Sequence, residues 1–98
     1  MPSTRPTRIA SGADRPRLAP HVRLTYDPVR QRHVLLTPEA VSLLNPTGAD
    51  VLRLCDGTRT FAAVVAELRQ QYDGVDDDEV RAFLDRLADR RCVEVGRG

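Results

Sequence analysis

The sequence changes character at a single Asn-Pro pair, Asn45 and Pro46. Before this pair, apolar and polar residues alternate over short runs, which is the period of a half-buried strand. After it, apolar residues recur every three or four positions, which is the period of an amphipathic helix. Asn is a preferred N-cap residue, and proline is tolerated at the first helical position because its missing N–H would have no partner there. The chain is therefore predicted to form strands first and helices second.

Three short strands are predicted before this boundary. The run at 21–27, HVRLTYD, alternates, and its Asp-Pro continuation is typical of a turn. The run at 33–37, HVLLT, then predicts an antiparallel hairpin with the first. The third run, AVSLL at 40–44, follows Pro38 and Glu39 closely enough to continue the meander.

Three helices are predicted after the boundary. The first begins at Pro46 and stops before Gly57, and the second is capped by Thr60 and runs to about Tyr72. The third starts in the acidic run 76–79, where carboxylates complement the positive end of the helix dipole. The segment CVEV at 92–95 closes the chain as a short extended piece. The predicted fold class is α+β, with a small three-stranded antiparallel sheet packed beside a three-helix bundle that resembles a winged helix-turn-helix.

Composition predicts one domain. Residues 1–17 are rich in proline and arginine and predict a flexible N-terminal tail, which leaves residues 18–98 as a single domain. No hydrophobic leader and no run of roughly 20 apolar residues is present, so we expect a cytoplasmic protein without membrane contact. The two cysteines lack a partner motif and are expected to stay reduced. A homodimer formed through an open strand edge or an exchanged arm is left open.

The residue pattern argues against catalysis and against a cofactor. The sequence shows no nucleophile with a base, no paired carboxylates placed for acid-base work and no phosphate-binding glycine loop. His21 and His33 are expected to face each other across the first hairpin, but such a pair is more typical of a surface contact than of a metal site. We therefore predict no catalytic residues, no metal and no cofactor.

A DNA-binding winged helix is the alternative that the helices raise. A recognition helix presents its first turn to base edges and phosphates, whereas this third helix begins with four acidic residues, 76–79. The 15 basic and 14 acidic residues give a net charge of +1, which is not the basic excess typical of nucleic-acid binding. We therefore expect no nucleic-acid partner, and keep DNA binding as the second hypothesis.

The third predicted strand indicates peptide binding as a different function. It is bracketed by Pro38 and Pro46, which cannot donate to a strand ladder and therefore limit pairing to the residues between them. An exposed strand edge offers unpaired N–H and C=O groups, and a peptide can add to it as a further strand. The segment between the prolines is therefore a candidate docking strip for an extended peptide.

Three short motifs lie in and after this region: Pro38-Glu39, the run 44–48 (LNPTG) and the run 55–60 (CDGTRT). Their order and spacing resemble those of the PqqD family of pyrroloquinoline quinone (PQQ) biosynthesis proteins. The similarity extends from about Arg17 to Val95. It implies a non-catalytic peptide chaperone, a RiPP recognition element, that binds the precursor peptide PqqA and presents it to the radical SAM enzyme PqqE.

The resemblance also implies where the peptide binds. Related domains take a leader peptide as an added strand on their third strand, in a groove bordered by the third helix. Transferred to this sequence, the prediction is a strip on the third strand and a border on the third helix. The candidate residues are Val41, Ser42, Leu43, Leu44, Arg81, Leu84, Asp85 and Ala88.

Overall fold

The computed structural model describes residues 8–97 and has five strands and three helices in that range. The strands are β1 (Arg15–Leu18), β2 (Arg23–Asp27), β3 (Arg32–Leu36), β4 (Val41–Leu43) and β5 (Val93–Gly96). The helices are α1 (Pro46–Leu54), α2 (Phe61–Gln71) and α3 (Asp77–Asp89). The chain is thus α+β, as the sequence predicts.

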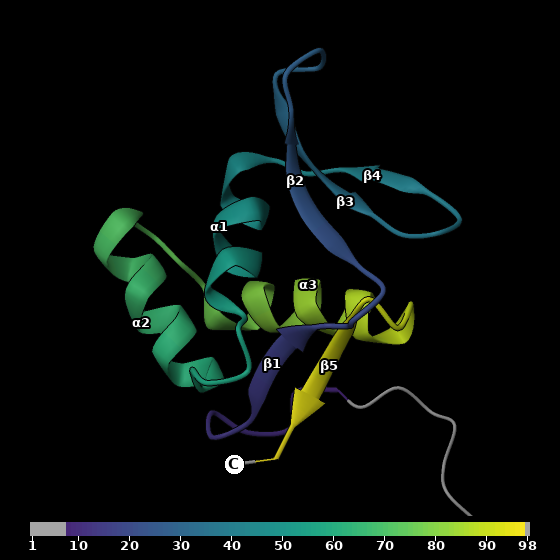
Figure 1. Ribbon diagram of the computed structural model, residues 1–98. Coiled ribbons are helices and arrows are strands. Elements are labelled where there is room, and N and C mark those ends of the chain that lie inside the picture. The colour runs from purple at the N-terminus through teal and green to yellow at the C-terminus, as the bar shows by residue number, and fades with distance from the viewer. Residues whose placement is uncertain (1–7, 98) are drawn as a thin grey trace, which may run out of the picture.

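The three predicted strands form one antiparallel sheet in the order β2-β3-β4. Figure 1 shows the β2–β3 hairpin standing away from the helices, with α3 crossing below this sheet. α1 follows β4 after a two-residue connection and packs against β2 and β3. The resemblance to a winged helix-turn-helix stays a prediction.

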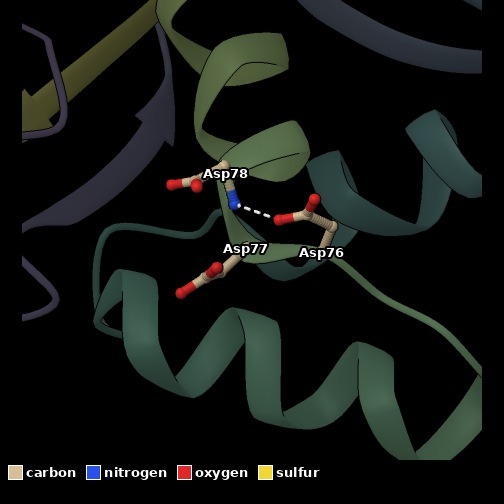
Figure 2. Close-up of side chains that lie close together, drawn as sticks. All are labelled: Asp76, Asp77 and Asp78. Atoms are coloured by element: carbon tan, nitrogen blue, oxygen red, sulfur yellow. Dashed lines mark hydrogen bonds between the residues drawn. The ribbon is translucent and has the colours of Figure 1, made fainter.

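Side-chain caps begin each helix where the sequence places them. The Asn45 side chain accepts a hydrogen bond from the Gly48 N–H at 2.6 Å, and the Thr60 hydroxyl accepts one from Ala63 N–H at 3.1 Å. At α3 the carboxylate of Asp76 accepts from the Asp78 N–H at 2.9 Å, as Figure 2 shows. Such contacts satisfy donors that have no partner inside the helix, so each helix begins at a fixed residue. Gly74, with φ of +71°, makes the turn between α2 and α3 in a conformation that few other residues adopt.

The N-terminal region is the main correction to the predicted fold. β1 pairs antiparallel with β5 in a separate two-stranded sheet, which joins the two ends of the chain (Figure 1). The side chain of Ile9 is 6% exposed and belongs to the core, and Pro16 is fully buried. The predicted tail over residues 1–17 is therefore wrong from residue 8 onward, while residues 1–7 lie outside the described part of the chain.

One hydrophobic core connects both sheets and all three helices. It contains buried side chains from each helix, such as Leu52, Leu68 and Leu84, together with Leu35 of the three-stranded sheet and Val93 of β5. Because both sheets and all three helices contribute, the position of α3 relative to the three-stranded sheet is fixed by shared packing. None of the helices in the described range is long and apolar enough to span a bilayer.

Candidate peptide-binding site

β4 is an edge strand. It pairs with β3 on one side only, and no other strand among residues 8–97 pairs with its second side. The N-terminal segment, which could have occupied this edge, pairs with β5 instead. The row of main-chain groups that the sequence predicts to be vacant is therefore vacant in the described structure.

The register shows which main-chain groups face outward. The Leu44 N–H donates to the His33 carbonyl at 3.0 Å, and the Thr37 N–H donates to the Ala40 carbonyl at 3.0 Å. Residues 40 and 44 therefore direct their main-chain groups toward β3. Because this direction alternates along an antiparallel strand, Ser42 also faces β3, whereas Val41 and Leu43 face away from it. The free edge thus offers the N–H and C=O groups of Val41 and Leu43.

The same two residues expose large apolar side chains. Val41 is 54% exposed and Leu43 is 50% exposed, and they are two of the four exposed large hydrophobic residues in the described range. A short apolar edge strand of this kind is a template for pairing with another chain. Ser42 is half-buried, and Leu44 is 7% exposed and belongs to the core. Leu44 therefore anchors the strip, while Val41 and Leu43 are its accessible part.

Both ends of the strip are fixed. At the start, the Ala40 N–H donates to the Thr37 hydroxyl at 3.1 Å across the two-residue turn that contains Pro38. At the end, the Leu44 carbonyl accepts from the Arg32 guanidinium at 3.2 Å, and Asn45 caps α1. These contacts order the strip before any partner arrives, which reduces the entropy lost on binding.

The candidate residues of α3 do not lie together on one accessible face. Leu84 and Ala88 are both 0% exposed, so they offer no surface to a peptide in this structure, and their contact with a peptide stays a prediction. Their spacing puts them on the side of α3 that packs into the protein interior. Arg81 is exposed and forms an ion pair with Asp78, one turn earlier on the same helix. Asp85 is half-buried, and its carboxylate accepts the Ile9 N–H at 2.8 Å.

The N-terminal segment explains why Asp85 is occupied. Arg8 pairs with Asp89 through its guanidinium, next to the contact between Ile9 and Asp85. The hydrogen bond from Arg8 lowers the pKa of the Asp89 carboxyl group. This side of α3 therefore binds the protein's own N-terminal segment. Sequence analysis missed it because that segment was assigned to a tail.

A different side of α3 approaches the start of α1, which follows β4 after two residues. Phe83 is half-buried and packs near the start of α1, since a Cβ added to Gly48 would lie 3.2 Å from its ring. Arg86 lies one turn further along and lines the same pocket as Asn45 and Gly48. In the sequence, the apolar residues of this helix recur at helical spacing, at Val80, Phe83, Leu84 and Leu87. That period does not indicate which edge of the apolar stripe stays accessible.

The turn before β4 also lies near the end of α3. Burial raises the pKa of the Cys92 thiol, the nearby Arg90 lowers it, and the Glu39 carboxylate adds a smaller upward effect. Glu39 lies in the turn between β3 and β4, and Cys92 follows α3. The Glu39 carboxylate is therefore within electrostatic range of the Cys92 thiol, which follows the C-terminal end of α3.

Both cysteines are free and buried. Burial, with a smaller contribution from Asp56, raises the pKa of the Cys55 thiol to about 12, so it stays protonated. His33 faces Tyr26, with ring centroids 5.1 Å apart, and the predicted pairing of His33 with His21 is wrong. The exposed carboxylates of Asp76, Asp77 and Asp78 lie within 4.8 Å of one another at the first turn of α3 (Figure 2). They act there as a cap and a charged first turn.

Comparison with known proteins identifies related sequences. Residues 32–93 match the family model described as coenzyme PQQ synthesis protein D (PqqD). A PqqA binding protein of Rhodopseudomonas palustris (strain BisB5) is 37% identical over 90 residues, which cover 89% of this chain and 88% of that protein. A PqqA binding protein of Azotobacter vinelandii is 38% identical over 84% of this chain and 91% of that protein.

Two further relatives correspond to parts of longer C/D proteins. The bifunctional coenzyme PQQ synthesis protein C/D of Methylorubrum extorquens is 39% identical over 87 residues, but the match spans only 23% of that longer protein. The solution NMR structure of the PqqD truncation of Methylobacterium extorquens PqqCD aligns with a TM-score of 0.66 and 41% identity, over 86% of this chain and 93% of that one. It is described as a functional and stand-alone RiPP recognition element. On the evidence of the family model and of relatives matched over most of their length, this chain belongs to the PqqD family.

Proposed function

We propose that this protein is a non-catalytic peptide chaperone of PQQ biosynthesis, which binds the precursor peptide PqqA as an added strand on β4. The observation that carries the proposal is the vacant β4 edge, with the main-chain groups of Val41 and Leu43 directed outward. Main-chain pairing supplies affinity, and the exposed apolar side chains of the same residues supply selectivity. Relatives named as PqqA binding proteins support the choice of peptide.

The bound peptide is then presented to the radical SAM enzyme PqqE, which carries out the chemistry. A chaperone in this role needs no catalytic residues of its own, and the buried, protonated thiol of Cys55 is consistent with that. Because a ribosomally made peptide is available in the cytoplasm, we place the interaction there. The alternative of a DNA-binding winged helix has no support from the relatives, whose names refer to PQQ synthesis and PqqA binding.

A titration of ¹⁵N-labelled protein with unlabelled PqqA tests the proposal. We expect the largest amide shifts at Val41 and Leu43, because their N–H groups gain a hydrogen-bond partner, and smaller shifts at Ser42, whose N–H already faces β3. A scrambled peptide of the same composition is the control. Absence of binding, or shifts confined to β1 and β5, would refute strand addition at β4.

The titration is repeated at several protein concentrations. A homodimer that paired two β4 edges would occupy the same groups as the peptide and would weaken apparent binding as protein concentration rises. The role in presentation is tested separately, by measuring whether PqqE binds the protein–peptide complex more tightly than the protein alone.

A further inference from the structure

A pocket of about 470 Å³ begins directly beyond the end of β4. It lies between the start of α1, the loop after α2 and the first half of α3, and we call it the α1–α3 pocket. Asn45 and Gly48, which line it, follow the strip Val41–Leu43 within a few residues. An extended chain advances about 3.3 Å per residue, so a peptide paired with β4 reaches this pocket two or three residues past the paired segment.

Part of the pocket lining is apolar. Val51 of α1, Val75 of the loop and Phe83 of α3 contribute aliphatic and aromatic surface. Tyr72 also lines it, and its hydroxyl is held by a hydrogen bond to the Asp50 carboxylate. Because its hydroxyl is already hydrogen-bonded, Tyr72 offers the surface of its ring to a ligand, and other residues supply the polar contacts.

The lining also carries an excess of negative charge. Three carboxylates, those of Asp73, Asp76 and Glu79, line the pocket, against one guanidinium, that of Arg86. Asp76 is engaged as the cap of α3. Within residues 8–97, the side chains of Asp73 and Glu79 take part in no hydrogen bond or ion pair. Two carboxylates are thus free for a partner at a pocket whose lining is partly apolar.

This combination fits a long basic side chain. Lysine and arginine bury an aliphatic stem against apolar surface while the charged end remains at a polar, partly hydrated position. Aspartate or glutamate in the same place would be repelled by the net charge of the lining, and a purely apolar side chain would leave both carboxylates unpaired. The pocket volume exceeds that of one such side chain, which leaves room for water around the charged group.

We propose that the α1–α3 pocket binds a lysine or arginine of the same peptide, with Glu79 and Asp73 as its charge partners. It would act as a second recognition point, which sets the register of the peptide on β4. Main-chain pairing alone does not fix register on so short a strand. This proposal rests on the proposed function, since it requires a peptide paired with the β4 edge.

The test combines protein and peptide substitutions. In PqqA, each lysine is replaced in turn by norleucine and each arginine by citrulline, which remove the charge and keep the stem. In the protein, Glu79→Gln and Asp73→Asn remove the carboxylates, and Glu67→Gln, on an exposed position of α2 away from the pocket, is the matched control. Affinities are measured by calorimetry, with the amide shifts of Val41 and Leu43 recorded for each pair.

We expect Glu79→Gln or Asp73→Asn to weaken binding of natural PqqA by about three- to tenfold, and Glu67→Gln to have no effect. One of the modified peptides should bind the wild-type protein more weakly than natural PqqA does, by the same factor. The pocket variants should bind this modified peptide and natural PqqA with nearly equal affinity, because the change in the protein and the change in the peptide remove the same interaction. The loss should shrink at high salt.

Two failures are distinguishable. If wild-type protein binds PqqA with shifts at Val41 and Leu43 but the pocket variants keep their affinity, or no single basic residue of the peptide matters, the pocket proposal is overturned and the proposed function stands. If the wild-type protein does not bind PqqA, or binds without those shifts, both proposals fail together. Thermal melts of Glu79→Gln and Asp73→Asn check that each variant is folded.

Discussion

Asp14 shows how a single buried residue joins the two ends of the chain. Its side chain is 3% exposed and accepts hydrogen bonds from the Ala10 N–H at 2.7 Å, the Ser11 N–H at 3.1 Å and the Arg97 guanidinium at 2.5 Å. Burial by itself would raise the pKa of this carboxyl group, but the two N–H donors and Arg97 outweigh it, and the pKa is lowered. Asp14 is therefore ionised in the folded protein at neutral pH.

The lowered pKa predicts a stability effect that depends on pH. The folded protein binds the Asp14 proton more weakly than the unfolded chain, whose ordinary value is 3.8, so the stabilisation is present above that value and is lost as the pH falls through the folded-state pKa. We expect Asp14→Asn to lower the free energy of unfolding by about 1–3 kcal/mol at pH 7. The difference in the free energy of unfolding between wild type and variant should become smaller below pH 3.8. Urea denaturation of both proteins at pH 7 and at pH 3 measures this difference.

Glu67→Gln is the control for that experiment, because Glu67 is exposed on α2. It should leave the free energy of unfolding at pH 7 close to that of the wild type. If the free energies of unfolding of wild type and Asp14→Asn differed by the same amount at pH 7 and pH 3, the role assigned to the ionised carboxylate would be contradicted.

At the scale of elements, the direction of the main-chain groups on β4 gives a matched pair of substitutions. Leu43→Pro removes an N–H that faces outward, whereas Ser42→Pro removes one that faces β3. We expect Leu43→Pro to weaken PqqA binding more than tenfold while the protein stays folded, because the peptide loses a main-chain partner. Ser42→Pro should lower the melting temperature further, because it breaks the pairing of β3 and β4. Circular dichroism melts and calorimetric titration separate the two effects, and wild-type affinity in Leu43→Pro would contradict strand addition.

The N-terminal segment 8–14 is the element that sequence analysis misplaced, and its contribution to stability can be measured. It contacts α3 through Ile9 and supplies the carbonyls of Gly12 and Asp14 to the N–H groups of Ala62 and Phe61 at the start of α2. Ile9→Ala removes a core side chain and should cost about 2–4 kcal/mol in the free energy of unfolding.

Arg8→Ala is the matched control for that substitution, because the ion pair between Arg8 and Asp89 lies on the surface and is screened by solvent. It should have little effect on the free energy of unfolding. Equal and small effects of Ile9→Ala and Arg8→Ala would show that the segment does not belong to the cooperative core.

For the whole molecule, peptide binding should appear as thermal stabilisation. A ligand that binds only the folded protein adds about 2.7 kcal/mol of stability at one hundred times its dissociation constant. For a domain of this size each kcal/mol raises Tm by roughly 4–8 °C, so saturating PqqA should raise Tm by roughly 10–20 °C. Differential scanning fluorimetry measures the shift. The Leu43→Pro variant should show little of it, and an equal shift in that variant would place the binding site elsewhere.

Local patterns in the sequence determined the three central strands, the three helices and where each helix begins. Alternation, helical period and the caps Asn45, Thr60 and Asp76 act over a few residues, so a linear reading captures them. The bracketed edge strand was predicted for the same reason, because Pro38 and Pro46 limit pairing from within the segment itself. Resemblance to the PqqD family came from short motifs in those same local segments.

Only the tertiary structure decided the pairing of β1 with β5 and the surroundings of α3. A four-residue strand near the N-terminus carries too weak a pattern to be assigned until its partner at the other end of the chain is known. The accessible side of α3 likewise depends on what covers it. Leu84 and Ala88 face the core, and the Asp85 carboxylate accepts a hydrogen bond from the Ile9 N–H. The side of α3 toward α1, which carries Phe83 and Arg86, therefore remains accessible. Helical period fixes which residues share a face, but contacts between distant segments determine which face remains exposed.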